Sequence, residues 1–116
     1  MATIGEVLTA LPGGDDTIAA ISSAVGRGAT ALVRVSGRDA DSIAGRVVRP
    51  WPIPPRMATL CSIHDPVTGA LLDRALVTRL EQGRSFTGDA TVELSTHGGT
   101  VTQALALAAL LAAGAR

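Results

Sequence analysis

The stretch SFTGDATVELSTHGG, residues Ser85–Gly99, decides the predicted fold. Its middle part, ATVELS, alternates as a β-strand does, and Glu93 shares one face with its polar neighbours. The strand pattern stops at two glycines. From Thr100 to about Ala113 the spacing of apolar residues becomes helical, and Gly114 is a natural stop. We therefore expect a strand that carries one carboxylate, then a tight turn and a helix.

A second stretch, TALVRVS over residues Thr30–Ser36, alternates in the same way, and Arg34 lies on the face opposite Val33 and Val35. Two strands of one small sheet thus each place a single charge at mid-strand. One interpretation is a solvent-exposed face with an Arg–Glu cross-strand pair. The other is the polar floor of a ligand pocket, where Arg34 meets a carboxylate or carbonyl and Glu93 accepts N–H groups of a heterocycle.

The remaining pattern predicts one domain over residues 16–116, preceded by a loosely ordered leader over residues 1–15. The order of elements is β-β-α-β-β-β-α, without internal repeats. This order predicts an α+β fold, a small, mostly antiparallel or mixed sheet with two or three helices. The other expected elements are a strand over 16–22, a helix over 37–48 capped by Ser36 or Asp39, an extended proline-rich connector over 49–56, and a β-hairpin over 57–64 and 71–80.

Composition excludes several function classes. Ten Arg and no Lys balance ten Asp plus Glu, so a broad electrostatic surface for nucleic acid or membrane is not indicated. Without Lys the chain cannot form the lysine-bearing phosphate loop of GTPases. The lone Cys61 excludes an internal disulfide. The N-terminus has no basic secretory signal region, and the apolar run over residues 101–113 is too short to span a bilayer, so we expect a cytoplasmic protein.

Two glycine-rich turns are candidate pocket loops. The first contains Gly26, Arg27 and Gly28, and the second contains His97, Gly98 and Gly99 before the last helix. Each has a structural explanation as a tight turn. Each also presents backbone N–H groups to a ligand, and the second adds the positive end of a helix dipole.

Metal binding and hydrolysis have weaker support. Cys61 and His64 form a single pair without a partner motif and would point to opposite faces of a strand, so we expect no metal site. A Ser–His hydrolase built from Ser85 or Ser95 with His97 stays open, but no nucleophile-elbow motif supports it. We expect no catalytic residue in this chain.

Four segments resemble the N-terminal domain of the MnmE (TrmE) family of bacterial tRNA uridine-modification GTPases in order and spacing. The resemblance covers about Asp16 to Arg116. The pairing of SFTG, VEL and HGG with RVSG is the most distinctive part. The four segments are DTIAAIS…GRG…ALVRVSG, PPRMATLCSIHDPVTGALLDRALV, SFTGDATVELSTHGG and LLAAGAR.

The resemblance implies an α+β fold similar to the tetrahydrofolate-binding fold of aminomethyltransferases. It implies a homodimer that binds 5-formyl- or 5,10-methylene-tetrahydrofolate, with Arg34 and Glu93 as the folate-contacting residues. In that family, GTP, Mg and K bind through a GTPase domain that this chain lacks. The FAD protein MnmG is the partner, and tRNA is the substrate whose wobble uridine receives a 5-carboxymethylaminomethyl-type group. No membrane partner is implied.

The chain departs from the family pattern at three places. SFTG is followed by Asp89 and Ala90 instead of Glu-Asp, Thr100 stands where a Pro is usual, and the first loop reads VGRGA. The family's downstream segment, with a lysine that helps to hold folate, is also absent. Two alternative functions therefore stay open: a dimerisation scaffold with a degenerate folate pocket, and a folate-dependent one-carbon transferase domain.

Overall fold

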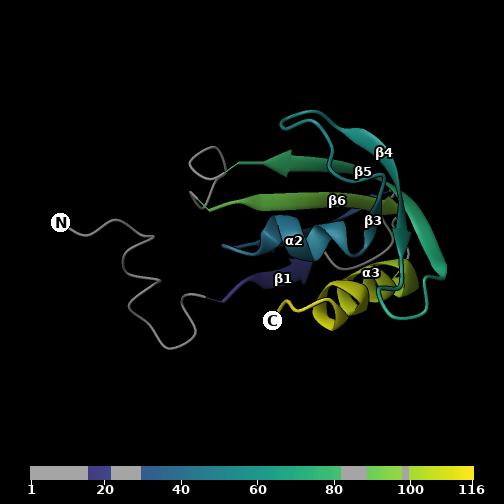
Figure 1. Ribbon diagram of the computed structural model, residues 1–116. Coiled ribbons are helices and arrows are strands. Elements are labelled where there is room, and N and C mark those ends of the chain that lie inside the picture. Colours follow the sequence, from purple (N-terminus) through teal and green to yellow (C-terminus); the bar gives the residue numbers. More distant parts are fainter. Residues whose placement is uncertain (1–15, 22–29, 82–88, 98–99) are drawn as a thin grey trace.

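The computed structural model describes residues 16–21, 30–81, 89–97 and 100–116, which are drawn in colour in Figure 1. The predicted leader, residues 1–15, lies outside the described residues. The described part contains six strands and two helices. In chain order these are β1 (Ile18–Ile21), β2 (Thr30–Ser36), α2 (Ala40–Gly45), β3 (Val48–Arg49), β4 (Thr59–His64), β5 (Leu71–Leu80), β6 (Thr91–His97) and α3 (Thr100–Ala112).

The strands form one sheet in the order β1-β2-β6-β5-β4-β3, and every neighbouring pair is antiparallel. β6 follows the other described strands in the sequence but lies between β2 and β5 in the sheet. It therefore joins the β1–β2 hairpin to the β3–β4–β5 meander. The predicted α+β class is confirmed. The predicted strand count is wrong by one, because β3 was not expected.

The additional strand β3 lies where the sequence pattern predicted the end of a helix. α2 ends at Gly45, and Val48 pairs with Ile63 of β4. The backbone N–H of His64 also donates to the carbonyl of Val47 at 2.7 Å. Val47 and Val48 are both fully buried. Their β-branched side chains favour the strand over another helical turn.

The predicted cap of α2 is corrected in the same region. Asp39 occupies the N-cap position, but its side chain makes no capping hydrogen bond. Instead, the backbone N–H of Asp39 donates to Thr17 Oγ1 at 2.9 Å, and Ser42 Oγ donates to the Asp39 carbonyl at 3.0 Å. The start of α2 is therefore tied to the residue that precedes β1.

The proline-rich connector, predicted over residues 49–56, is neither helix nor ladder strand after Arg49, which belongs to β3 instead. It contains cis peptide bonds before Pro50 and Pro52. It passes beside the end of β5. Arg79 Nε donates to the Ile53 carbonyl at 3.2 Å, and the Arg56 N–H donates to the Arg79 carbonyl at 2.8 Å. The connector thus satisfies the backbone carbonyl of Arg79, which lies beyond the ladder that β5 forms with β4.

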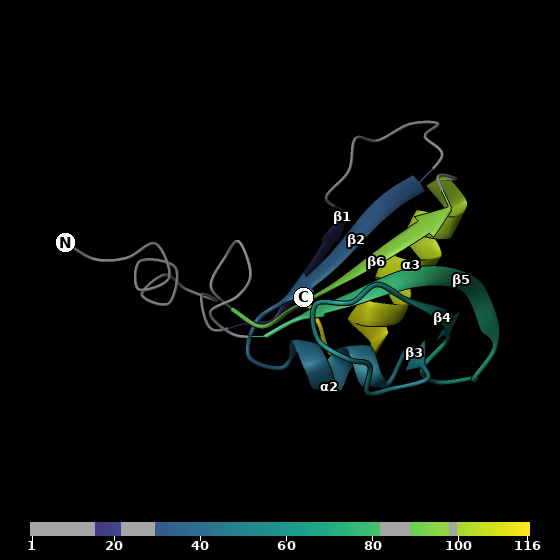
Figure 2. The same cartoon turned by 90° about the horizontal axis from the view of Figure 1, so that it is seen from above.

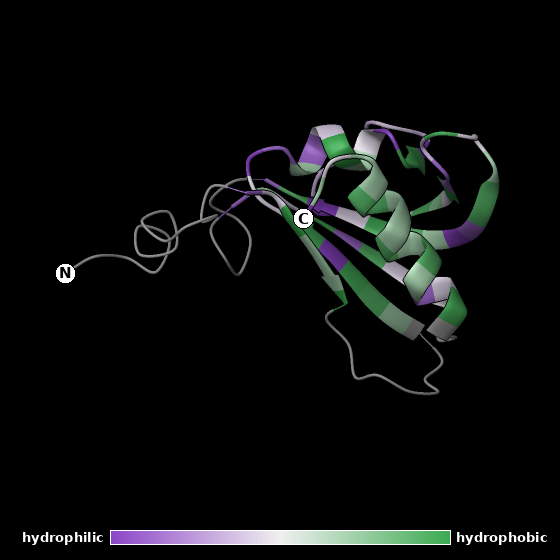
Figure 3. Cartoon of the chain, turned by 90° about the horizontal axis from the view of Figure 1, so that it is seen from below, coloured by the Kyte–Doolittle hydropathy of each residue, from purple (hydrophilic) through white to green (hydrophobic). Residues whose placement is uncertain are grey.

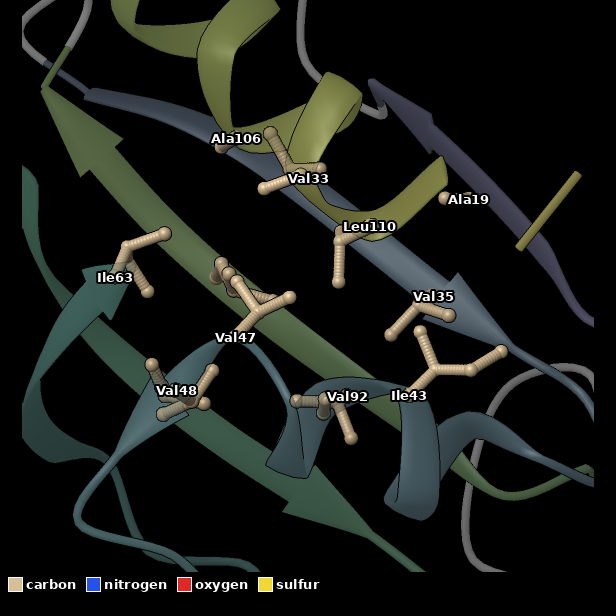
Figure 4. Close-up of a cluster of buried hydrophobic side chains, with 14 of the residues drawn as sticks. Ala19, Val33, Val35, Ile43, Val47, Val48, Ile63, Val92, Ala106 and Leu110 are labelled. Atoms are coloured by element: carbon tan, nitrogen blue, oxygen red, sulfur yellow. The ribbon is translucent and has the colours of Figure 1, made fainter. Parts of the chain in front are cut away.

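Both helices cover the same face of the sheet, as Figures 2 and 3 show from opposite sides. Alternate residues of the strands point toward the helices and form the core with them. In Figure 4, Val33 and Val35 of β2 and Val92 of β6 lie beneath Leu110 of α3 and Ile43 of α2. Burial of this apolar surface is the main force that holds the helices on the sheet. Neither of the two described helices covers the opposite face, which we call the open face.

Candidate functional site

The open face carries a row of four residues that lie side by side across the sheet, which we call the central row. Ala20 of β1 is the cross-strand partner of Arg34, Arg34 is the partner of Glu93, and Glu93 is the partner of Thr78 of β5. Direct partners in an antiparallel ladder point to the same face of the sheet. The two mid-strand charges predicted from the sequence are therefore brought together.

Arg34 and Glu93 form an ion pair. Arg34 Nη2 donates to Glu93 Oε1 at 3.0 Å, and the two side chains are 31% and 26% exposed. A single hydrogen bond uses little of the capacity of either group, because guanidinium has five N–H donors and carboxylate about four acceptor positions. Arg34 Nε is buried and has no hydrogen-bond partner within the described part of the chain. The ion pair therefore holds N–H donors of Arg34 and carboxylate acceptor positions of Glu93 close together on the open face.

A second polar contact lies one row away. Ser36 is the cross-strand partner of Thr91, and their hydroxyl oxygens are 3.0 Å apart in a hydrogen bond. Thr91 also donates to the Asp89 carbonyl at 3.2 Å. Thr91 is almost fully buried although it belongs to the open face. This polar pair therefore extends the floor around Arg34 and Glu93.

Exposed apolar side chains surround this polar centre. Ile18 of β1 is the partner of Ser36, and Leu60 of β4 is the partner of Leu76 of β5, so all three share the open face. Ile18 is 51% exposed, Leu60 56% and Leu76 49%. Such a surface, with apolar edges and a few convergent polar groups, suits a flat amphipathic ligand or a second protein surface.

The two predicted pocket loops leave the sheet at the same end. Thr30, the first residue of β2, pairs with His97, the last residue of β6. The loop glycines Gly26, Gly28, Gly98 and Gly99 and the neighbouring Arg27 lie outside the described residues, and of His97 the structure describes only the backbone. Arg34 is four residues from Thr30, which is about 13 Å along the strand.

The two alternative sites with weaker support rest on Cys61 with His64 and on Ser85 or Ser95 with His97. Within the described part of the chain, no three His, Cys, Asp or Glu residues are close enough to hold a metal ion. Cys61 is buried, and this burial raises the pKa of its thiol. His64 Nδ1 is hydrogen-bonded to the Gly69 carbonyl at 3.0 Å. The Ser–His hydrolase stays untested, since Ser85 lies outside the described residues.

Sequence reasoning missed Thr78, Ala20 and the Ser36–Thr91 pair. Polar or small residues at alternate strand positions carry no signal of their own. Only the strand register brings these residues next to Arg34 and Glu93. The groups of the open face suit binding of hydrogen-bonding rings, and none of those described is arranged as a nucleophile with a base.

Across residues 16–21, 30–81, 89–97 and 100–116, no helix has the length and apolar character needed to cross a bilayer. α3 has 13 residues, about 20 Å at 1.5 Å per residue.

The chain is similar to known proteins over most of its length. The family model described as "GTP-binding protein TrmE N-terminus" matches residues 17–116. Among curated proteins, the chain is similar to "tRNA modification GTPase MnmE" of Geobacter sulfurreducens, 42% identical over 105 residues, with 88% of this chain and 23% of the relative covered. It is also similar to the protein of that name from Nitratiruptor sp., 40% identical over 102 residues, with 88% and 22% covered. The chain therefore spans about a fifth of the length of these relatives.

Proposed function

The chain belongs to the TrmE N-terminal family, and from this membership we propose that it is the tetrahydrofolate-binding and homodimerisation domain of a tRNA-modifying GTPase. The observation that carries the proposal is the half-buried Arg34–Glu93 pair at the centre of the open face. An ion pair on a fully exposed surface contributes little to stability. Arg34 and Glu93 lie instead among partly buried residues, and this placement favours a binding role.

The chemistry of a reduced pterin suits this face. The ring presents N–H groups along one edge, and Glu93 supplies a carboxylate acceptor for them. Arg34 supplies donors for a carbonyl or carboxylate of the same ligand. The ligand would be 5-formyl- or 5,10-methylene-tetrahydrofolate, which acts as a one-carbon donor. The chain would bind and orient this cofactor, and the cofactor would supply the one-carbon chemistry.

The proposed whole protein carries the remaining functions. GTP, Mg and K would bind to a GTPase domain, since this lysine-free chain cannot form a phosphate loop with GK[ST]. MnmG, with its FAD, would be the partner, and the cytoplasmic complex would place a 5-carboxymethylaminomethyl-type group on the wobble uridine of tRNA. Relatives of this chain carry the name tRNA modification GTPase.

Homodimerisation has separate support on the open face. Ile18, Leu60 and Leu76 are exposed apolar residues around the polar centre. A second copy would bury them, at about 25 cal/mol for each Å² of apolar surface removed from water.

A second candidate function is a dimerisation scaffold without folate binding. The observation in its favour is that Arg34 and Glu93 already satisfy part of each other's charge at 3.0 Å. A ligand must compete with this contact.

A calorimetric titration with 5-formyl-tetrahydrofolate separates the two candidates. Glu93→Gln keeps the shape of the side chain and removes its charge, so we expect affinity to fall about 10- to 100-fold, since a hydrogen bond to a charged group contributes about 1.5–3 kcal/mol. The matched control is Glu81→Gln, because Glu81 forms an exposed ion pair with Arg56 at 3.3 Å. The control should bind as the wild type does.

Equal affinity in wild type and Glu93→Gln would contradict the folate site. A dimeric, folded wild-type domain that binds no folate would establish the scaffold function instead. Sedimentation and thermal unfolding of each variant verify that the comparison is made between folded proteins.

A further inference from the structure

A second polar row crosses the open face on strands β3, β4 and β5, and we call it the basic row. Arg49 of β3 is the cross-strand partner of Ser62 of β4, and Ser62 is the partner of Arg74 of β5. Direct partners in an antiparallel ladder share a face. Their chain neighbours Val48 and Ala75 are buried in the core, so the basic row belongs to the open face. A hydroxyl group therefore lies between two guanidinium groups.

Both arginines of the basic row are available to a ligand. Arg49 and Arg74 are exposed, and in the described part of the chain neither side chain forms an ion pair. Each guanidinium offers a planar fork of N–H donors that matches a carboxylate. The two arginines lie two strands apart, which is about 10 Å. With the Ser62 hydroxyl between them, they suit a ligand that carries more than one carboxylate.

β5 connects the basic row to the central row. Thr78, the partner of Glu93, shares the open face with Leu76 and Arg74, because the three occupy alternate positions of this strand. At about 3.4 Å per residue, Thr78 and Arg74 are about 14 Å apart. Leu76 between them is 49% exposed. Starting from Glu93, the open face thus presents a carboxylate, then an apolar side chain, then a cationic row.

The row on the other side of the central row has a different character. It consists of Ile18, Ser36, Thr91 and Leu80, which are cross-strand partners in that order. None of these side chains is charged. Of the two directions along the strands, only the one toward Arg74 therefore leads from the central row to cationic groups.

We propose that the basic row binds the glutamate carboxylates of a folate whose pterin ring is held at Glu93 and whose aryl ring lies over Leu76. This inference rests on the proposed function, because it takes Glu93 as the pterin end of the site. A reduced folate joins a pterin, an aryl ring and a glutamate end to end. These groups have the same order as the carboxylate, the apolar side chain and the arginines along β5. Ile18 and Leu60 lie beside this path and stay available to a second copy.

The spacing of the two arginines favours a tail of more than one glutamate. Each further γ-linked glutamate adds one α-carboxylate to the ligand. Arg74 lies on the strand next to Glu93 and meets the first glutamate, whereas Arg49, two strands farther out, meets the next one. A single exposed arginine–carboxylate pair contributes little. The tail gains affinity because several such contacts form within one ligand.

Calorimetric titration with two ligands tests the proposal: the triglutamate of 5-formyl-tetrahydrofolate, and 5-formyl-tetrahydropteroate, which has no glutamate. We expect the wild type to bind the triglutamate at least about fivefold more tightly. The double variant Arg49→Gln, Arg74→Gln should bind the two ligands equally. The control Arg38→Gln removes an exposed guanidinium from the turn before α2 and should keep the wild-type ratio. Thermal unfolding verifies that all variants are folded.

The outcomes separate this inference from the proposed function. If the wild type binds both ligands equally, or if the double variant keeps the wild-type ratio, the basic row is not the tail site, although the folate site stands. If the wild type binds neither ligand, the proposed function fails, and an NMR titration with tri-γ-glutamate decides the rest. A shift of the Ser62 N–H signal that the double variant lacks would show that the basic row binds carboxylates. An unchanged signal would overturn that part as well.

Discussion

Gly37, the glycine of the RVSG stretch, has a backbone conformation and a contact that exclude any side chain. Its φ is +140°, and a Cβ added there would lie 2.7 Å from Thr17 Cα and 2.8 Å from Thr17 Oγ1. The nearest atom belongs to the backbone, so side-chain rotation cannot relieve the contact. For Gly37→Ala we expect a loss of unfolding free energy of about 2–6 kcal/mol, from about 1–3 kcal/mol of backbone strain and a similar cost of overpacking.

Gly69→Ala is the matched control for this variant. Gly69 also has a positive φ, +78°, but an added Cβ would meet nothing within 4 Å. Its substitution should therefore cost only the strain of the left-handed region, about 1–2 kcal/mol. Urea unfolding followed by circular dichroism measures both values. If the two variants lose the same stability, Thr17 and Gly37 are not held in rigid contact, and the packing of Thr17 against the start of α2 is refuted.

Two further predictions concern the core and the β4–β5 turn. Leu110→Ala should lower the unfolding free energy by about 2–5 kcal/mol, because Leu110 is fully buried, whereas exposed Leu111→Ala should change it little; equal effects in urea unfolding would refute the packing of α3. Backbone N–H groups of Thr68 and Val67 donate to Asp65 and lower the pKa of its carboxyl. Asp65 should therefore contribute stability above the pKa of the unfolded carboxyl and lose it as pH falls through the lower, folded pKa. Unfolding of Asp65→Asn measured against pH should lack this step, and an unchanged profile would contradict it.

The sequence alone predicted the central features of the candidate site. Alternation placed Arg34 and Glu93 each on the face of its strand opposite the apolar residues, and the structure shows that they are direct partners. The alternation of residues within one strand, however, does not determine how that strand is aligned with its neighbours in the sheet. Which residue of β5 stands beside Glu93, and that Ala20 stands beside Arg34, depends on pairings between strands far apart in the sequence.

Local patterns failed where tertiary contacts decided the conformation. Residues 37–48 have helical spacing, but α2 stops at Gly45 because Val48 gains a strand partner in Ile63. A strand of two residues is too short to show alternation. Asp39 occupies the position where a capping side chain is typical, yet here its backbone N–H donates a hydrogen bond to Thr17 Oγ1. The two glycine loops lie outside the described residues, so their proposed role stays a prediction.

The position of β6 between β2 and β5 has a consequence for synthesis of the chain. The β1–β2 and β3–β4–β5 parts are local in sequence, whereas Arg34 and its partner Glu93 are 59 residues apart. While a ribosome makes the chain from its N-terminus, the inner edges of β2 and β5 have no partner until β6 emerges. Contacts of such long sequence separation slow folding, and unpaired edges recruit other chains. Chaperone binding to nascent chains that end before Thr91 should therefore be much stronger than to chains that include α3.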